Sequence, residues 1–247
     1  MFTLKHFIWL GICLIFIVGM LILAKKLKFS LKTASLIMSI ICILSEVSKM
    51  MSDMQDNVAG GMSLDPRSLP FHLCSLMIFV VFYIFLAPDS KFKQTLINFL
   101  AAIGTIGSFM ALIIPTNGVE FNEIGPYQCF VYHAGLIWFS IYLIMSKNAK
   151  LDLKAYIKNT SILIFLAFMM IYVNGALSQY GTNFFYVVRP PMENLPILNL
   201  NHGWYVYFIT LLVLGLILMT AFHLPFIIKN KLRKEEAQNN IENNWKL

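Results

Sequence analysis

Charged residues are scarce in this chain of 247 residues: Asp, Glu, Lys and Arg together make up 13% of it, whereas 58% is apolar and the mean hydropathy is +0.72. An average soluble domain carries about 25% charged residues, and a water-soluble fold of this length cannot hide so much apolar surface. The composition therefore excludes an ordinary soluble domain and predicts that lipid is the solvent. The length suits one membrane domain of about six to eight helices, each of about 20 residues.

Acidic residues and cysteines are also few. The chain has 12 Asp and Glu against 19 Lys and Arg, which gives a net charge of +7. The basic residues lie at the ends of apolar segments, where the positive-inside rule places them, so we expect no nucleic-acid partner. The four cysteines show neither a C-x-x-C motif nor zinc-ligand spacing, and we predict no metal and no cofactor. They are Cys13, Cys42, Cys74 and Cys129.

Seven apolar segments follow one another along the chain. They span about Phe7–Ala24, Ala34–Met51, Leu69–Ala87, Leu96–Ile114, Pro126–Met145, Tyr156–Leu177 and Trp204–Ile228. We therefore predict an all-α, polytopic membrane bundle of seven transmembrane helices over residues 1–229, followed by a frayed, polar cytoplasmic tail over residues 230–247. Pro225 is expected to kink or end the last helix, because proline removes a helical hydrogen bond.

The distribution of basic residues predicts the orientation. Only Lys5 precedes the first apolar segment, whereas Lys25, Lys26 and Lys28 follow it. A signal peptide has its basic residues before the apolar core, so this segment is predicted to be an uncleaved first helix. If the loop after this segment is inside, 15 of the 19 basic residues fall inside and 4 outside. The positive-inside rule then predicts a protein of the cell membrane with its N-terminus outside and its C-terminus in the cytoplasm.

Polar side chains gather at the ends of the segments that this topology places outside, whereas the inner halves are almost purely apolar. The outer set is Glu46, Ser48, Lys49, His72, Cys74, Ser75, Cys129, His133, Asn174, Asn199, Asn201 and His202. Polar groups within a membrane are costly and mark functional sites. One polar cavity that opens to the outer face is the simplest explanation.

Within this set, Cys74 and His133 are expected at similar depth. At 1.5 Å per residue, Cys74 lies roughly 7 Å below a helix start near Leu69, and His133 roughly 10 Å below Pro126. If the two helices are neighbours, the imidazole can take the thiol proton, and the resulting thiolate can attack an ester carbonyl. His72 is a poor partner for Cys74 on one helix, because two residues turn a helix by about 200°.

Other interpretations of these residues stay open. Cys129 lies one helical turn from His133 and is a rival nucleophile, and a disulfide between Cys129 and Cys74 would end the catalytic interpretation. The histidine can equally serve as a hydrogen-bonding bridge between helices, with the cysteine as packing.

The charged and amide side chains of the outer set are candidates for binding a substrate. Glu46 and Lys49 are three residues apart, so they can form an ion pair or belong to a site. Arg67 and Arg189 are interface anchors or ligands of a lipid phosphate. The remaining candidates, His72, Asn174 and Asn201, complete the predicted substrate-binding set, with Asn174, Asn201 or backbone N–H groups as oxyanion donors.

Two stretches carry a resemblance to a known family. The sequence Leu69-Pro-Phe-His-Leu-Cys-Ser75 resembles a motif of the bacterial YwaF family, and so does a second stretch in the last third of the chain. That stretch comprises Asn174-Gly175, Gly181-Thr182-Asn183-Phe-Phe-Tyr186, Pro190, Asn194-Leu195 and Trp204-Tyr205. The YwaF family is similar to the eukaryotic transmembrane protein 164, an acyltransferase of ether phospholipids. The resemblance implies a Cys nucleophile at Cys74 and a His base at His133.

The leading hypothesis is a membrane lipid acyltransferase or esterase that uses a Cys-His pair in an outward-facing cavity. Its partners would be membrane lipids, namely an acyl donor and a lysolipid acceptor. One alternative is a carrier or binding protein for a small polar solute, although no repeated halves with matching broken helices are present. Another alternative is a non-catalytic assembly factor of the cell envelope.

Overall fold

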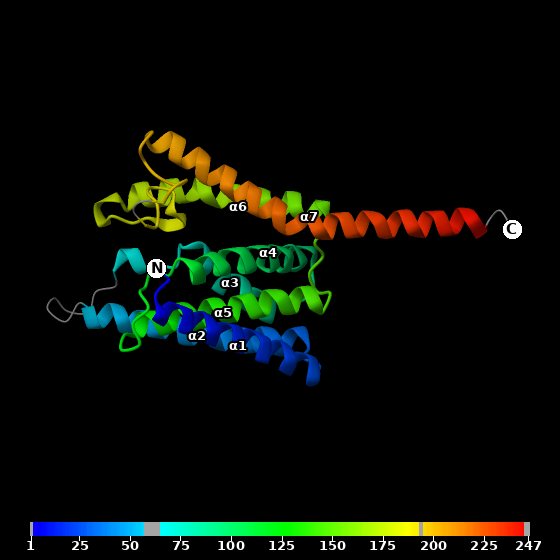
Figure 1. Cartoon of the computed structure of the whole chain (residues 1–247), viewed down its shortest axis with the longest axis horizontal. Coiled ribbons are helices and arrows are strands. Elements are labelled where there is room, and N and C mark those ends of the chain that lie inside the picture. The colour runs from blue at the N-terminus through cyan, green and yellow to red at the C-terminus, as the bar shows by residue number, and fades with distance from the viewer. Residues whose placement is uncertain (1, 57–64, 193–194, 245–247) are drawn as a thin grey trace.

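The computed structural model describes residues 2–56, 65–192 and 195–244. Asn194 of the family motif and Lys246 of the basic set lie outside these ranges. The described chain is all-helical and has no strand (Figure 1). The helices are α1 Leu4–Lys26, α2 Leu31–Asp56, η1 Pro66–Ser68, α3 Leu73–Leu86, α4 Lys91–Ile113, α5 Ile124–Met145, α6 Leu153–Ala176, η2 Ser178–Tyr180, η3 Phe184–Tyr186 and α7 Trp204–Asn244.

Six of these helices are long and apolar enough to cross a membrane, within the part of the chain that the structure describes. Among the seven α-helices of the described chain the exception is α3, which has 14 residues and is therefore about 21 Å long, shorter than the roughly 30 Å of a hydrocarbon core. The N-terminus lies at one end of the bundle and the C-terminus beyond the other, as an odd number of passes requires (Figure 1). Seven spans and their orientation stay predictions.

Helix α3 begins later than the sequence suggests. The predicted start near Leu69 is wrong: the helix begins at Leu73, after a short 3-10 helix and a turn in which the Phe71 N–H donates to the Leu69 carbonyl. The physical reason is Pro70, because a proline disfavours the helical conformation of the residue before it. Leu69 accordingly has φ −55° and ψ 146°. As a consequence, Cys74 lies in the first turn of α3.

Helix α7 continues well beyond its apolar part. Pro225 lies inside the helix and does not end it, and the axis of α7 changes direction partway along its length (Figure 1). The tail after Lys229 was expected to fray, but it is helical as far as Asn244. Lys, Arg, Glu and Ala in this stretch favour a helix, and Lys231 and Glu235 lie 3.8 Å apart as an i, i+4 pair.

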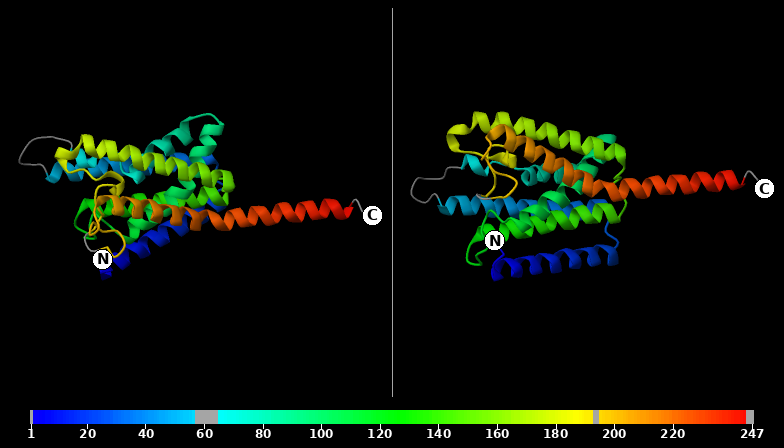
Figure 2. Two further views of the ribbon diagram at one scale, coloured as in Figure 1. Left: turned by 90° about the horizontal axis from the view of Figure 1, so that it is seen from above. Right: turned by 45° about the horizontal axis from the view of Figure 1, so that its top comes forward.

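The helices form two layers. Helix α5 packs against α4, α2 and α1, and α3 packs against α2 and α4. The pair α6 and α7 lies on the side opposite α1, and α4 contacts both members of the pair (Figures 1 and 2). Trp138, Phe130 and Phe139 of α5 are fully buried. Many outward-facing side chains are apolar and exposed, such as Ile15 at 74%, as expected of helices whose solvent is lipid.

Candidate functional site

A cavity of about 1060 Å³ lies between the two layers. Its walls come from α2, α3, α4 and α5 on one side and from α6, α7 and the η3 segment on the other. It brings together six of the predicted site residues, namely Glu46, Lys49, Arg67, His72, Cys74 and His133. Asn174, Arg189 and Asn201 are not among its lining residues.

Cys74 is the second residue of α3, so it lies beside the free backbone N–H groups of a helix start. His72 is the N-cap residue, and its side chain makes no capping hydrogen bond. The N–H groups of Leu73, Cys74 and Ser75 have no hydrogen-bond partner among the described residues. This helix end therefore offers unused donors and a positive dipole next to the Cys74 sulfur.

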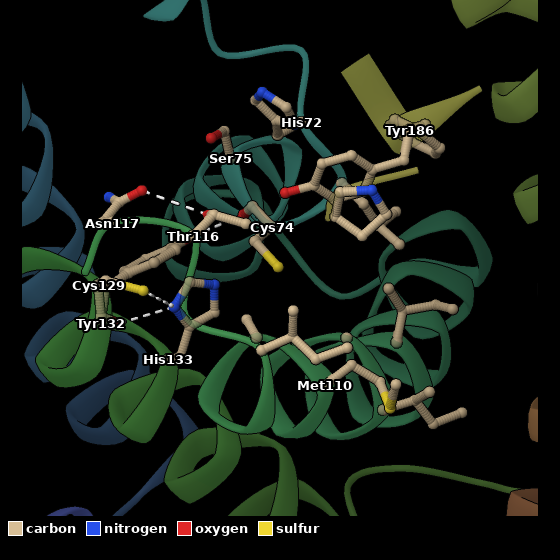
Figure 3. A pocket seen from close by; sticks show the side chains of 18 of the residues that line it. His72, Cys74, Ser75, Met110, Thr116, Asn117, Cys129, Tyr132, His133 and Tyr186 are labelled. Carbon is tan, nitrogen blue, oxygen red and sulfur yellow. Dashed lines mark hydrogen bonds between the residues drawn. The ribbon is translucent and has the colours of Figure 1, made fainter. Parts of the chain in front are cut away.

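His133 is held in one tautomer by its own helix. Its Nδ1 lies 2.6 Å from the carbonyl oxygen of Cys129, and a carbonyl only accepts, so Nδ1 carries the proton. The other ring nitrogen, Nε2, then has a free lone pair. Figure 3 shows Nε2 on the side of the ring that faces the cavity and the sulfur of Cys74. A nitrogen in this state can accept a proton from a group in the cavity.

The thiol and the imidazole face each other without a direct bond. The structure has no hydrogen bond between Cys74 and His133, although both line the cavity. A methyl group added at Gly107 on α4 would lie 3.7 Å from Cys74 Sγ. This glycine therefore keeps space open beside the thiol, on the same cavity wall.

Cys129 is less suited to be the nucleophile. All four cysteines are free, so the disulfide considered between Cys74 and Cys129 is not formed. The Cys129 sulfur lies 3.6 Å from His133 Nδ1. That nitrogen already carries a proton for the Cys129 carbonyl, so it cannot also take one from the Cys129 thiol. Cys129 is also only 3% exposed.

Charged residues lie at the mouth of the cavity, defined here by Glu46, Lys49 and Arg67, and form two ion pairs. Lys49 Nζ lies 2.7 Å from Glu46 Oε2, so the predicted ion pair forms, and both residues line the cavity. Arg67 lies 2.7 Å from Asp65, and hydrogen bonds from the Arg67 side chain hold the pKa of Asp65 below its usual value. Arg67 is 67% exposed, so its guanidinium borders both the cavity and solvent.

Asn174 does not line the cavity, but its hydrogen bonds position the η3 segment, which does. Its Nδ2 donates to the carbonyls of Met170 at 2.7 Å and Phe184 at 3.1 Å, and its Oδ1 accepts from the Phe184 N–H at 2.8 Å. The side chain is buried and its amide is fully occupied. Asn174 thus fixes the η3 segment to the end of α6. Arg189 donates to the Gly181 carbonyl at 2.9 Å, and Asn201 is exposed.

The η3 segment forms part of the cavity wall, a role that sequence reasoning did not assign. Phe185 and Tyr186 have left-handed backbones, with φ of 59° and 54°. Tyr207 donates a hydrogen bond to the Tyr186 carbonyl, and Trp204 Nε1 donates to Val187 at 2.9 Å. The Tyr186 side chain consequently lies in the cavity near Cys74 and His72 (Figure 3). Asn174 and Trp204, two of the residues that hold this wall, belong to the second family motif.

A family model matches residues 1–222. The chain belongs to the TMEM164 family. This confirms the resemblance to transmembrane protein 164 that the two motifs carry. No curated protein and no solved structure matches the chain significantly. TMEM164 membership and the six apolar helices together indicate a multi-pass membrane protein.

A second polar cluster of this TMEM164-family chain lies at the other end of the cavity, where we expected apolar surroundings. Asn159 of α6 and His223 of α7 are both fully buried. Asn159 Nδ2 lies 3.1 Å from the Asn98 carbonyl of α4 and 3.2 Å from His223 Nε2. The prediction that the inner halves are almost purely apolar is wrong at this point. Hydropathy averages over many residues, so it does not reveal a single buried amide that joins three helices. In the described chain, no group of three or more His, Cys, Asp or Glu residues is arranged to hold a metal ion.

Proposed function

We propose that this protein is a membrane lipid acyltransferase or esterase, with Cys74 as the nucleophile and His133 as the general base. The observation that carries the proposal is the orientation of the two groups. The Cys74 sulfur and the unprotonated Nε2 of His133 face each other across one cavity (Figure 3). Catalytic contacts are often long in the absence of substrate and shorten when substrate binds.

In the first step, Nε2 of His133 takes the proton of the Cys74 thiol. The thiolate attacks the carbonyl carbon of an acyl ester, and a C–S bond forms as the carbonyl electrons move to oxygen. The tetrahedral intermediate collapses, the C–O bond to the glycerol oxygen breaks, and the imidazolium returns its proton to that oxygen. The products of this step are a lysolipid and an acyl thioester on Cys74.

In the second step, a hydroxyl group takes the acyl chain from Cys74. Nε2 of His133 removes the hydroxyl proton, and the oxygen attacks the thioester carbonyl. The C–S bond breaks, and the proton passes back to the Cys74 sulfur. A lysolipid acceptor makes the protein an acyltransferase, whereas water makes it an esterase.

The start of α3 suits the stabilisation of the charged intermediate. The free N–H groups of Cys74 and Ser75 are the proposed donors to the oxyanion, because they are unpaired and adjoin the sulfur. Donors that need not reorganise during the reaction lower its barrier, and loss of one such donor typically costs about 10²- to 10³-fold in rate. Asn174 is not a donor to the oxyanion, because its amide is occupied with Phe184.

The mouth suits a lipid headgroup. Lys49 and Arg67, each paired with a carboxylate, are the proposed ligands of a phosphate. We propose that this mouth faces the outer side of the cell membrane, in line with the distribution of basic residues. The acyl donor and the lysolipid acceptor then enter from the outer leaflet.

The test is covalent labelling of the purified protein in lipid nanodiscs with a chloroacetamide that carries an acyl chain. Wild type is compared with Cys74→Ala, Cys129→Ala and His133→Ala, and the labelled residue is identified by peptide mass spectrometry. We expect labelling of Cys74 that is lost in Cys74→Ala, falls sharply in His133→Ala and persists in Cys129→Ala. An unreactive Cys74, together with no effect of His133→Ala, would remove the enzymatic proposal in favour of a binding or carrier protein.

A further inference from the structure

Tyr186 approaches the thiol from the layer opposite to Cys74. It belongs to the η3 segment, which packs against α6, whereas Cys74 and His133 come from α3 and α5. Figure 3 shows the phenol of Tyr186 pointing across the cavity, with its hydroxyl end toward Cys74. This hydroxyl takes no part in the proton transfers between Cys74 and His133, so its chemical role is unassigned.

The backbone of η3 is held in a disfavoured conformation. Phe185 and Tyr186 are both left-handed, which crowding by the Cβ atom disfavours in every residue except glycine. Residues of this kind persist only where the surrounding structure holds them, and they cluster at functional sites. Tyr207 donates a hydrogen bond to the Tyr186 carbonyl, and Asn174 holds both backbone groups of Phe184. These bonds fix the backbone on both sides of Phe185, so the direction of the phenol is set before substrate binds.

The side chain of Tyr186 is fixed as well. Its ring packs against the imidazole of His72, the N-cap residue of α3, with the ring centres 5.8 Å apart. Burial raises the pKa of Tyr186 and outweighs a hydrogen bond with the Thr116 side chain, which lowers it. The nearby thiols of Cys74 and Cys129 raise it further, because a thiolate disfavours a second negative charge. At neutral pH the phenol therefore keeps its proton and can donate a hydrogen bond.

We propose that the Tyr186 hydroxyl is a catalytic oxyanion donor, which completes from the second layer the hole that the N–H groups of Cys74 and Ser75 begin. The inference rests on the proposed function, because the negative oxygen forms only when the Cys74 thiolate attacks a carbonyl. As the C–S bond forms, an electron pair of the C=O bond moves to oxygen, and the phenol donates a hydrogen bond to it. When the bond to the leaving group breaks, the electron pair returns, and Tyr186 has kept its proton throughout.

The two kinds of donor complement each other. The backbone N–H groups at the start of α3 approach the oxyanion from the helix that carries the sulfur, whereas the phenol approaches from the facing layer. An oxyanion has lone pairs on several sides and can accept from both donors at once. Because the phenol is fixed beforehand, its hydrogen bond needs no reorganisation, and loss of one such donor typically lowers a rate about 10²- to 10³-fold.

Two reactions of the same thiol separate an oxyanion donor from a structural residue. Alkylation by the acyl-chain chloroacetamide displaces chloride at a saturated carbon, so no oxyanion forms. Acylation by p-nitrophenyl octanoate passes through the tetrahedral oxyanion, and its p-nitrophenolate leaves without a proton donor. Both rates are measured at one pH on the full chain in nanodiscs, and mass spectrometry confirms that Cys74 is the modified residue.

We expect Tyr186→Phe to be alkylated within about twofold of the wild-type rate and acylated about 10²-fold more slowly. The phenylalanine ring keeps the contact with His72 and removes only the hydroxyl. Tyr180→Phe is the matched control, because it removes an exposed phenol from the neighbouring η2 segment. Thr116→Val keeps the Tyr186 hydroxyl and removes its hydrogen-bonding neighbour, so acylation should fall at most about threefold.

Equal effects of Tyr186→Phe on alkylation and acylation would overturn the inference, because a structural residue affects both reactions of the thiol. A loss in Thr116→Val as large as that in Tyr186→Phe would also overturn it, since the bond between the layers would then matter rather than the donor. In both cases acylation of wild-type Cys74 leaves the proposed function standing. A wild type that is alkylated at Cys74 but never acylated would instead remove the proposed function, and this inference with it.

Discussion

The phenol of Tyr132 on α5 donates a hydrogen bond of 2.7 Å to the main-chain carbonyl of Cys74 on α3. The two helices otherwise pack mainly against other neighbours, α3 against α2 and α4, and α5 against α4, α2 and α1. Because His133 directly follows Tyr132, this bond sets the position of the thiol relative to the imidazole. The proposed pair thus depends on one buried phenol that takes no part in the chemistry.

The first prediction is that Tyr132→Phe slows labelling of Cys74 about tenfold, because the start of α3 loses its link to α5. It also lowers the free energy of unfolding by about 0.5 to 1.5 kcal/mol, since the Cys74 carbonyl loses one hydrogen bond and keeps the helical one. The matched control is Tyr142→Phe, which removes a hydrogen bond of 2.9 Å from Tyr142 to the Phe29 carbonyl, away from the cavity. Tyr142→Phe should destabilise the protein without changing the labelling rate. Equal labelling rates in the two variants would mean that Tyr132 does not position Cys74.

The second prediction concerns pH. His133→Ala should lower the rate of Cys74 labelling about 10²-fold at neutral pH, in the range typical of a lost general base. As the pH rises, hydroxide removes the thiol proton without the imidazole, so the difference between wild type and variant should shrink. Rates measured from pH 6 to pH 10 check this, with the exposed His202→Ala as a control. A constant ratio at every pH would assign His133 a structural role.

Which residues gather at the cavity was partly predictable from the sequence, and their spatial arrangement was not. Depth along two apolar segments placed Cys74 and His133 at one level, and the structure brings both to one cavity. Which helices are neighbours depends on side-chain packing, and hydropathy carries no information on it. The tautomer of His133 depends on a carbonyl within its own helix, which appears only once the helix is built.

Some helix boundaries were predictable from the sequence and others were not. The predicted segment Pro126–Met145 agrees with α5, Ile124–Met145, to within two residues at its start. The agreement is close because the length of the apolar run sets the length of this helix. The start of α3 was missed, since proline is tolerated in a first helical turn and also disfavours the helical conformation of the residue before it. In the structure the second effect prevails at Leu69.

The third prediction concerns Asn174, whose role the sequence also left undecided. An amide near the end of an apolar segment is typical of a binding residue, but this one is occupied by backbone groups of Met170 and Phe184. Asn174→Ala should lower the free energy of unfolding by about 2 to 4 kcal/mol, because buried backbone groups of Phe184 lose their partners. Thermal unfolding in nanodiscs measures this, and the exposed Asn201→Ala should change it little. A loss of labelling in Asn174→Ala at unchanged stability would instead favour direct contact with substrate.

The fourth prediction separates the two cavity cysteines. Cys74→Ala should abolish acyl transfer from a labelled phospholipid to a lysolipid, whereas Cys129→Ala should retain at least about a third of the wild-type rate. The reason is that His133 Nδ1 is committed to the Cys129 carbonyl, and only Nε2 is free to take a proton from a group in the cavity. Cys129→Ala removes a buried sulfur, for which a cost of about 1 kcal/mol is expected from packing. An acid quench preserves the thioester, which mass spectrometry then locates, and release of the acyl group by hydroxylamine shows that it is bound to sulfur. An acyl group found on Cys129 would reverse the roles of the two thiols and require the other tautomer of His133.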